Sequence, residues 1–296
     1  MRIFDCFMYF DEELITNLRM NILDKYVDYF VIVESKYNHK GEKKYLKFDI
    51  KKHKRFRNKI IYLVQSHLPP NLEKFEKNDS NLVKEHKYIN NAVKRENFQR
   101  NFLEKGIVKA KDDDLILVSD VDEIPNLEKI KYSKIKHKII VFEQIMTYYK
   151  FNLALPKFIW HGTKGCLKKN LVSPQWLRNV KAKKYSKLRL DILFNDKKFN
   201  NIKLIKEGGW HFTNLKKPIE IQNKFKSYLH HREYELSGLN LKGIKELVEN
   251  RNAIYDLKAD QRINKIGIGT KLKKINDKIL PKFIIKNKNK LINWFI

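Results

Sequence analysis

The sequence contains few cysteines and no long apolar segment, which limits the class of protein to which it can belong. Its 296 residues include two cysteines, Cys6 and Cys166, and neither belongs to a C-x-x-C pair. This spacing excludes a zinc ribbon and a disulfide framework. No apolar run approaches the ~20 residues that span a bilayer. The first residues also lack the apolar segment and small-residue cleavage site of a secretory signal. We therefore expect a protein that is cytoplasmic or peripheral at a membrane surface.

Acidic residues are scarce relative to basic ones. Lys and Arg number 63 against 34 Asp and Glu, which gives a formal net charge of +29. Such an excess attracts nucleic acid, anionic lipid or phosphorylated substrates. The basic residues are mostly lysines, scattered through every segment together with many Asn and Ile, a pattern typical of an AT-rich genome. A basic nucleic-acid-binding module is therefore an alternative, but the even scatter argues against specific nucleic-acid binding.

Short apolar runs alternate with segments of helical periodicity, which predicts an α/β fold. Hydrophobic residues make up 42% of the chain, enough for the core of one large domain. Buried strands are predicted at residues 2–7, 29–33, 60–64 and 115–118. Helices are predicted from Asp11 and over about 84–105, where Gly106 provides the C-cap. This alternation predicts a parallel, doubly wound sheet with helices on both faces.

The second half of the chain is predicted to be more varied. We expect helices at 127–136 and 174–184, an extended aromatic segment at 139–155, a strand at 202–205, and helices at 221–234 and 242–255. We expect one domain over residues 1–215 and a helical, basic extension over 216–296 that packs on it. The chain ends in the apolar segment 291–296 with lysines nearby. This tail could contact an anionic membrane or pack back on the domain.

Carboxylates cluster directly after the predicted strand 115–118, in the sequence Ser119-Asp120-Val121-Asp122-Glu123. Open α/β sheets bind ligands at the carboxyl ends of their parallel strands. Asp120 and Asp122 project to one side if the extended conformation continues, and a cation between them removes their repulsion. Oxygen ligands of this kind suit Mn²⁺ or Mg²⁺, with substrate phosphates in the remaining positions. A solvated acidic turn is the alternative, but the preceding buried strand favours a metal site.

Further candidates follow from position and spacing. Glu96, Gln99 and Arg100 lie at i, i+3 and i+4, so they form either a cleft-facing cluster or an exposed ion pair. His211 follows Gly208-Gly209-Trp210 and is either a metal ligand or a structural residue. Metal-bound carboxylates at a sheet edge suit displacement at the anomeric carbon of a nucleotide sugar, because the cation stabilises the leaving diphosphate.

Such a displacement needs a carboxylate that takes the proton of the acceptor hydroxyl. The candidates are Glu123, Asp191 and Glu207, and Glu123 leads because it adjoins the metal motif. The same acidic motif could serve an aspartate-dependent phosphotransferase. Such sites want Thr or Ser two residues after the second aspartate, where this sequence has Ile124.

The sequence also resembles glycosyltransferase family 17, the family of the bisecting N-acetylglucosaminyltransferase of N-glycans. The resemblance covers nearly the whole chain. It is carried in order by residues 4–7, 27–35, Asn38-His39, Gly41, Glu96, 99–101, 119–125, 209–212 and Leu280-Pro281. It implies a GT-A-like Rossmann-type mixed sheet, a UDP-sugar donor with UDP-N-acetylglucosamine as the first choice, and inverting, β-forming transfer to a glycan or glycoconjugate.

The resemblance also assigns expected roles to residues. Asp120 and Asp122 match the metal and diphosphate motif, Glu34 matches a nucleotide contact, and Trp210 and His211 match the later site segment. The expected nucleotide-sugar-binding residues are Asp5, Glu34, His39, Glu96, Gln99, Arg100, Asp120 and Trp210. The expected ligands of Mn²⁺ or Mg²⁺ are Asp120, Asp122 and His211.

Overall fold

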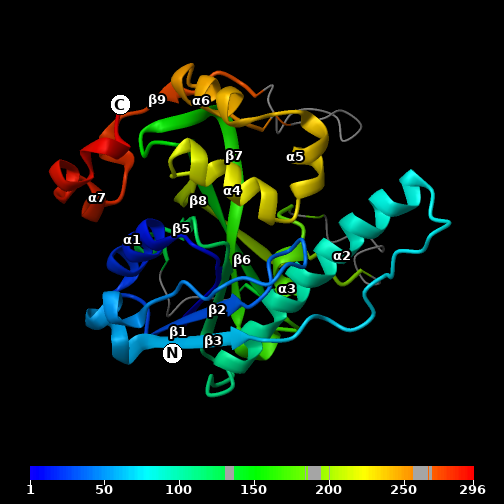
Figure 1. Ribbon diagram of the computed structural model, residues 1–296. Helices are drawn as coiled ribbons and strands as arrows, with labels where there is room; N and C mark the ends of the chain where they lie inside the picture. The colour runs from blue at the N-terminus through cyan, green and yellow to red at the C-terminus, as the bar shows by residue number, and fades with distance from the viewer. Residues whose placement is uncertain (131–136, 184, 186–194, 200, 256–265, 267–268) are drawn as a thin grey trace.

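The described part of the chain forms an α/β protein built on one mixed sheet (Figure 1). The computed structural model describes residues 1–130, 137–183, 185, 195–199, 201–255, 266 and 269–296. Within these residues the strand order is β3-β2-β1-β4-β7-β6-β8-β5, and β9 pairs with β7. The strands are β1 Ile3–Tyr9, β2 Tyr29–Ser35, β3 Ile60–Gln65, β4 Leu115–Ser119, β5 Glu123–Pro125, β6 Ile139–Tyr148, β7 Leu153–Leu167, β8 Ile202–Thr213 and β9 Lys273–Lys274.

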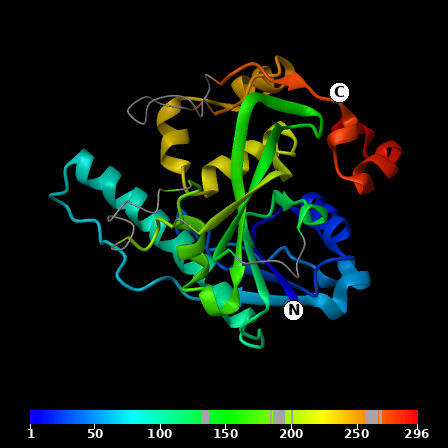
Figure 2. The ribbon, with the colours of Figure 1, turned by 180° about the vertical axis from the view of Figure 1, so that it is seen from behind.

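Helices cover both faces of this sheet, as the sequence predicts. The α-helices are α1 Glu13–Leu23, α2 Asn81–Asn101, α3 Pro174–Asn179, α4 Pro218–Ser227, α5 His231–Ser237, α6 Leu241–Glu249 and α7 Lys282–Lys286. Shorter 3₁₀ helices are η1 Ile50–Lys59, η2 Phe102–Gly106, η3 Leu127–Lys129, η5 Lys168–Asn170, η7 Asp277–Ile279 and η8 Lys288–Trp294. Figures 1 and 2 show α1 and α2 on opposite sides of the long strands. No described helix is long and apolar enough to cross a bilayer.

The N-terminal half of the sheet confirms the predicted parallel strands. β1 lies between β2 and β4, β3 follows β2, and all of these pairs are parallel. Alternate side chains point to opposite faces of such strands. Phe7 and Leu117 therefore pack in the core cluster that contains α1, whereas Val31 and Val118 pack with η2 and α3. Because the strands are parallel, β1, β2 and β4 end at the same edge of the sheet.

Beyond β4 the sheet departs from the parallel arrangement expected from the alternation of strands and helices. β7 runs antiparallel to β4 and β6, β8 runs parallel to β6, and β5 runs antiparallel to β8. The predicted extended segment 139–155 is a hairpin, because β6 ends at Tyr148 and β7 begins at Leu153. Tyr149 makes this turn with a φ of 63°. A turn made by a tyrosine carries no Gly or Pro signal, so the sequence does not mark it.

Several predicted helices are shorter than expected. Only the 3₁₀ turn η3 forms at the start of 127–136, and residues 131–136 lie outside the described part; α3 ends at Asn179 rather than at 184. The single helix predicted at 221–234 is wrong, since α4 ends at Ser227 and α5 begins at His231, and α6 ends at Glu249. Figures 1 and 2 show α4, α5 and α6 over one end of the long strands.

The C-terminal tail packs back on the sheet, which is one of the two arrangements considered for it. Leu280, Ile284 and Phe295 belong to the core cluster of α1. The Phe295 ring lies 5.4 Å from that of Phe151, measured between centroids. These side chains stabilise the tail against the protein by burial of apolar surface. Membrane contact of the tail and the domain boundary at 215 stay predictions.

A buried arginine joins the first helix to the acidic loop between β4 and β5. The guanidinium of Arg19 donates to both carboxylate oxygens of Asp5, at 2.7 and 2.6 Å, and neither side chain is exposed. It also donates to the hydroxyl of Ser119 at 2.9 Å and to the carbonyls of Val121 and Glu123 at 3.2 and 2.7 Å. Arg19 thereby fixes the backbone that carries the carboxylates.

Candidate functional site

A cavity of about 290 Å³ opens at the edge of the sheet where β1, β2 and β4 end. Its walls come from the segments that follow these strands and from α2, β8 and α4. The lining includes Tyr9, Phe10, Tyr37, Asn38, His39, Lys44, Glu96, Gln99, Asp120, Asp122, His211, Lys224 and Tyr228. The edge of the parallel strands is where ligand-binding crevices of α/β sheets form, so the sequence places the cavity correctly.

The polar trio of α2 faces this cavity rather than solvent. Glu96 and Gln99 line it, and Arg100 is buried next to them, 3% exposed, with its guanidinium 2.7 Å from Glu96. Nε2 of His39 donates a hydrogen bond to Oε1 of Gln99 at 3.0 Å. Burial lowers the pKa of His39, which favours the neutral ring. The cleft-facing alternative for the trio is therefore confirmed.

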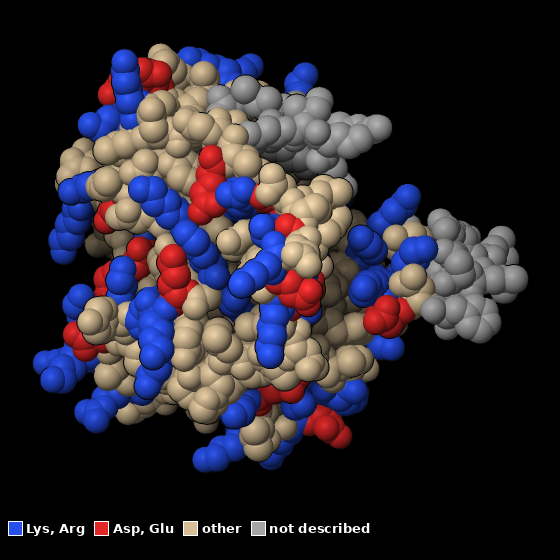
Figure 3. Space-filling view, turned by 45° about the vertical axis from the view of Figure 1, so that its right-hand side comes forward, with Lys and Arg blue, Asp and Glu red and all other residues tan. Residues whose placement is uncertain are grey.

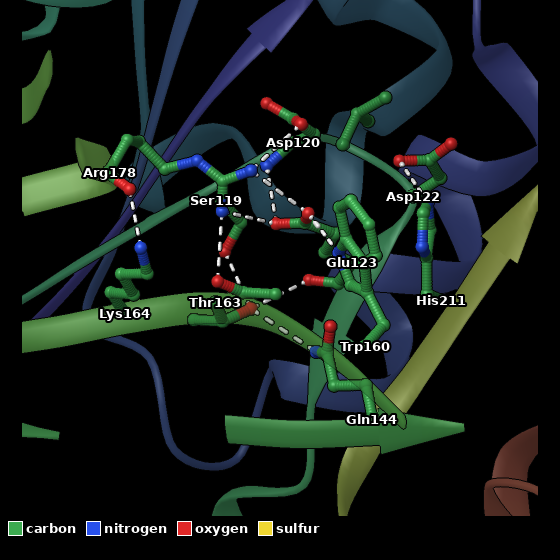
Figure 4. A network of polar contacts seen from close by, with 12 residues as sticks. Ser119, Asp120, Asp122, Glu123, Gln144, Trp160, Thr163, Lys164, Arg178 and His211 are labelled. Atoms are coloured by element: carbon green, nitrogen blue, oxygen red, sulfur yellow. Dashed lines mark hydrogen bonds and ion pairs between the residues drawn. The ribbon is translucent and has the colours of Figure 1, made fainter. Parts of the chain in front are cut away.

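Asp120 lies in a different setting from the predicted one. One carboxylate oxygen accepts from Arg100 at 3.1 Å. The other accepts from Arg178 at 3.0 Å (Figure 4). Burial alone would raise the pKa of Asp120, but the two guanidinium groups hold it well below its usual range. Because both oxygens are held by arginines, Asp120 is less suited than Asp122 to bind a cation.

Asp122 and His211 form the pair that points into the cavity. Oδ1 of Asp122 lies 3.5 Å from Nε2 of His211, and both side chains are nearly buried. The antiparallel pairing of β5 with β8 sets Glu123 opposite His211, which brings these distant segments together. Burial would lower the pKa of His211, but the carboxylate of Asp122 raises it above the usual value. Nζ of Lys224 lies 3.8 Å from the other oxygen of Asp122.

The residues present fit a cation that is shared with a substrate. Among the described residues no three His, Cys, Asp or Glu side chains are grouped to hold a metal ion by themselves. Asp122 and His211 offer one carboxylate and one imidazole on the same cavity wall. Mg²⁺ and similar ions are commonly held by one or two protein carboxylates, with water and substrate phosphates completing the shell. Asp122 and His211 are thus the residues that would hold the ion.

Glu123 does not lie in the cavity, although it leads the candidates for the catalytic base. Its carboxylate is fully buried and accepts from Arg178 at 2.8 and 3.0 Å, from the Trp160 indole at 2.7 Å and from the backbone N–H of Asp120 at 3.0 Å (Figure 4). These four hydrogen bonds occupy both oxygens of the carboxylate. Glu123 positions Arg178 and Trp160, and its setting gives no support to a role as base.

Of the other two candidate bases, Glu207 is not brought to the cavity. The Glu207 side chain is 82% exposed and pairs with Lys129 at 2.7 Å, away from the residues that line the cavity. Asp191 lies outside the described residues. The expectation for Glu207 came from its place before Gly208-Gly209, but its side chain faces solvent. The structure therefore gives no support to Glu207 as the base, and Asp191 stays a prediction.

Two residues expected to contact the nucleotide have structural partners instead. Asp5 is held by Arg19 below the acidic loop. Glu34 is fully buried and accepts from Lys44 at 2.5 Å, from Tyr62 at 2.8 Å and from backbone N–H groups of the following loop. Its carboxylate orders the segment after β2 and places Lys44 at the cavity. Asp5 and Glu34 thus stabilise the segments next to the cavity without lining it.

Trp210 also lies away from this cavity. Its indole donates to the carbonyl of Ile279 at 2.8 Å and lines a separate groove between α1 and the C-terminal segment. It is the neighbour of His211 in β8, so the two side chains point to opposite faces of the strand. Of the two residues matched to the later site segment, His211 reaches the cavity and Trp210 does not.

The sequence reasoning missed Arg178 and Lys224. Arg178 comes from α3, where no motif marks it, and it bridges Asp120 and Glu123. Lys224 comes from α4 and is hidden in the sequence among many other lysines. Its charged group reaches Asp122 from the C-terminal part of the chain. Neither side chain could be placed at the site without knowledge of the tertiary fold.

Lys164 is buried beneath this network and is expected to make stability depend on pH. Its ammonium donates to the carbonyls of Arg178 and Val180, the latter at 2.7 Å. Burial and the nearby Arg178 lower the pKa of Lys164 from 10.5 to about 7. Between these values the folded chain binds fewer protons than the unfolded chain, so the free energy of unfolding rises with pH.

Lys164→Met removes this titration. We expect the wild type to gain about 2–3 kcal/mol relative to the variant between roughly pH 6 and 9, at ~1.4 kcal/mol per pKa unit. Urea unfolding at both pH values measures the difference. Lys169→Met is the matched control, because the Lys169 side chain is 51% exposed. A stability difference between Lys164→Met and the wild type that does not change with pH would contradict the lowered pKa.

Comparison with known protein families identifies the family of this chain. The profile described as Glycosyltransferase family 17 matches residues 1–293, essentially the whole chain. The chain therefore belongs to glycosyltransferase family 17, and it is a glycosyltransferase. Membership of this family implies a nucleotide-sugar donor and a glycan acceptor. A comparison with curated proteins finds no match.

The charge on one face of the molecule does not form the patch expected of a nucleic-acid-binding module. Figure 3 shows lysines and arginines spread over one face of the molecule, with acidic residues between them. A nucleic-acid-binding surface concentrates its basic residues in a patch or stripe. Family membership favours glycosyl transfer over both this alternative and the phosphotransferase alternative.

Proposed function

We propose that this chain is a metal-dependent, inverting glycosyltransferase with a GT-A-type sheet. In this proposal it transfers N-acetylglucosamine from UDP-N-acetylglucosamine to a glycan hydroxyl in β linkage. The observation that carries the proposal is the Asp122–His211 pair in the cavity at the sheet edge of a family 17 chain. The choice of donor sugar and linkage comes from the resemblance to the family.

Two parts of the cavity wall suit the two parts of a nucleoside diphosphate. Tyr37, Asn38 and His39 follow β2 and offer an aromatic ring and hydrogen-bonding groups for the nucleoside. Asp122, His211 and Lys224 lie together on another part of the wall. An ammonium and a cation-binding pair suit the diphosphate, because both act on its negative charge.

The residues of the chain contribute orientation and charge to the transfer. A bound divalent cation would supply Lewis-acid stabilisation of the leaving diphosphate. Lys224 adds a positive charge that is already held in place by Asp122, so it needs little reorganisation during the reaction. Arg100 and Arg178 hold Asp120 and thereby the loop from which Asp122 projects.

A donor screen tests this function. Purified protein is incubated with Mn²⁺ or Mg²⁺ and a panel of nucleotide sugars, and free nucleoside diphosphate is measured with and without EDTA. We expect release of UDP from UDP-N-acetylglucosamine that EDTA abolishes. Equal turnover in EDTA would contradict metal dependence, and preference for another nucleotide sugar would contradict the choice of donor.

A further inference from the structure

A second cavity adjoins the first on the far side of Asp122. Its volume is about 480 Å³, and its walls come from the start of α1, the segment after β8, α4 and the C-terminal Trp294. Glu12, Asp122 and Lys224 line both cavities. The two cavities therefore meet at these three side chains. A ligand in the second cavity would reach a donor in the first one at this junction.

The charge of the second cavity is opposite to that of the chain. Among the described residues it is lined by two lysines and by the carboxylates of Asp11, Glu12, Glu13, Asp122 and Glu220, in a protein whose net charge is +29. One of these lysines, Lys216, is already paired with Asp11 at 2.5 Å. An anionic ligand would be repelled here, since like charges at short range cost several kcal/mol. The charge of the cavity therefore disfavours an anionic ligand and admits an uncharged or a cationic one.

Other groups in the lining suit a sugar. Carboxylate oxygens accept hydrogen bonds from hydroxyl groups, and the amides of Asn17 and Asn214 both donate and accept. The indole of Trp294 is partly buried against the core and also lines the cavity. An aromatic face combines a large apolar contact surface with fixed geometry, which matches the C–H face of a pyranose ring.

Glu12 is placed and held as a proton acceptor would need to be. It follows β1 and precedes α1, and one of its carboxylate oxygens, Oε2, accepts from the backbone N–H groups of Phe10 and Asp11 at 2.9 and 3.0 Å. These bonds fix the carboxylate, and no hydrogen bond from another described residue occupies Oε1. The residue is only partly buried, so this oxygen can meet a ligand. Unlike the saturated Glu123, Glu12 has a free acceptor at the junction.

We propose that the second cavity binds an uncharged sugar acceptor and that Oε1 of Glu12 takes the proton of its attacking hydroxyl. This inference rests on the proposed function. The acceptor oxygen forms a bond to the anomeric carbon of the donor while the bond from that carbon to the diphosphate oxygen breaks. The electron pair of the broken bond leaves with the nucleoside diphosphate, and the proton of the hydroxyl moves to Glu12.

Glu12→Gln tests the proton transfer, because glutamine keeps the shape of the side chain and an oxygen for the two backbone N–H groups. The probes are UDP-N-acetylglucosamine, Mn²⁺ and the methyl glycosides of glucose, galactose, mannose and N-acetylglucosamine. General-base catalysis contributes about 10²–10⁴-fold, so we expect kcat for transfer to fall about 10²-fold or more with the donor KM unchanged. Glu104→Gln is the matched control, since Glu104 is exposed and lines neither cavity, and should stay near wild type.

The outcomes separate this inference from the function on which it rests. If the wild type turns over no nucleotide sugar, the proposed function fails and the inference falls with it. If the wild type transfers and Glu12→Gln does so at the same rate, only the role of Glu12 is refuted. UDP binding and a thermal melt of Glu12→Gln serve as the control that any loss of transfer activity does not come from misfolding.

The class of acceptor is tested on the unaltered enzyme. Methyl glucuronide carries a carboxylate but otherwise matches methyl glucoside in size and hydroxyl pattern. We expect kcat/KM for the neutral glycoside to exceed that for the glucuronide by about 10-fold or more. A repulsion of roughly 1.4 kcal/mol between the added carboxylate and the acidic lining corresponds to this factor. Equal or better use of the glucuronide would overturn the assignment of an uncharged acceptor.

Discussion

Asp122→Ala is expected to reduce cation-dependent transfer about 10³-fold while the protein stays folded. The variant removes the carboxylate that lies 3.5 Å from His211 and 3.8 Å from Lys224 in the first cavity. In the proposed reaction the leaving diphosphate gains negative charge. Asp122 acts on this charge through Lys224, which it holds in place, and the loss of one preorganised electrostatic group typically costs 10²–10³-fold. Loss of the metal ion adds to this, so ~4 kcal/mol of transition-state stabilisation is a reasonable expectation.

The measurement is release of UDP as a function of Mn²⁺ concentration. Glu207→Gln is the matched control, because it also removes one carboxylate but from a side chain that is 82% exposed and paired with Lys129. The control should keep its activity. Its loss would restore Glu207 as a catalytic candidate, and an active Asp122→Ala would exclude Asp122 as a ligand of the ion.

His211→Ala separates the ion from the donor in the same experiment. His211 offers the second protein ligand, so its removal should shift the Mn²⁺ titration to higher concentration, with activity partly restored at high Mn²⁺. Asp122→Ala should not be restored in this way if its charge also holds Lys224 in place. An unchanged titration for His211→Ala would make this histidine a structural residue.

The sequence predicts those parts of the site that depend on local pattern. An apolar run followed by acids locates β4 and the loop with Asp120 and Asp122, and helical spacing finds the cleft-facing Glu96 and Gln99. Parallel strands bring such segments to one edge whatever their distance in the chain. The edge of the sheet and its polar residues can therefore be predicted without knowledge of side-chain contacts.

Roles that depend on which side chains meet could not be predicted. Glu123 adjoins the acidic motif in sequence, yet Arg178 from a distant helix saturates it, and Asp120 is shared by two arginines. Glu12 follows the first strand and reads as an ordinary acid at the start of a helix. Only the packing of α4 against the sheet edge places Lys224 next to it at the junction of the two cavities.

Arg19→Met is expected to lower the free energy of unfolding by about 3–5 kcal/mol, because it leaves the carboxylate of Asp5 buried without its partner. The variant also leaves the carbonyls of Val121 and Glu123 without their donor, and an unsatisfied buried group costs about 1–3 kcal/mol. Urea unfolding of the variant and the wild type measures the change.

Lys169→Met is the control for this prediction, since its partner Asp113 is 77% exposed and such surface pairs contribute about 0–1 kcal/mol. A loss in Arg19→Met no larger than in this control would show that the buried pair adds little. The double variant Asp5→Leu with Arg19→Met should recover part of the loss, because no unpaired charge remains. The part that it does not recover belongs to the carbonyls of the acidic loop. Weaker Mn²⁺ binding in the double variant would then link the buried arginine to the position of Asp122.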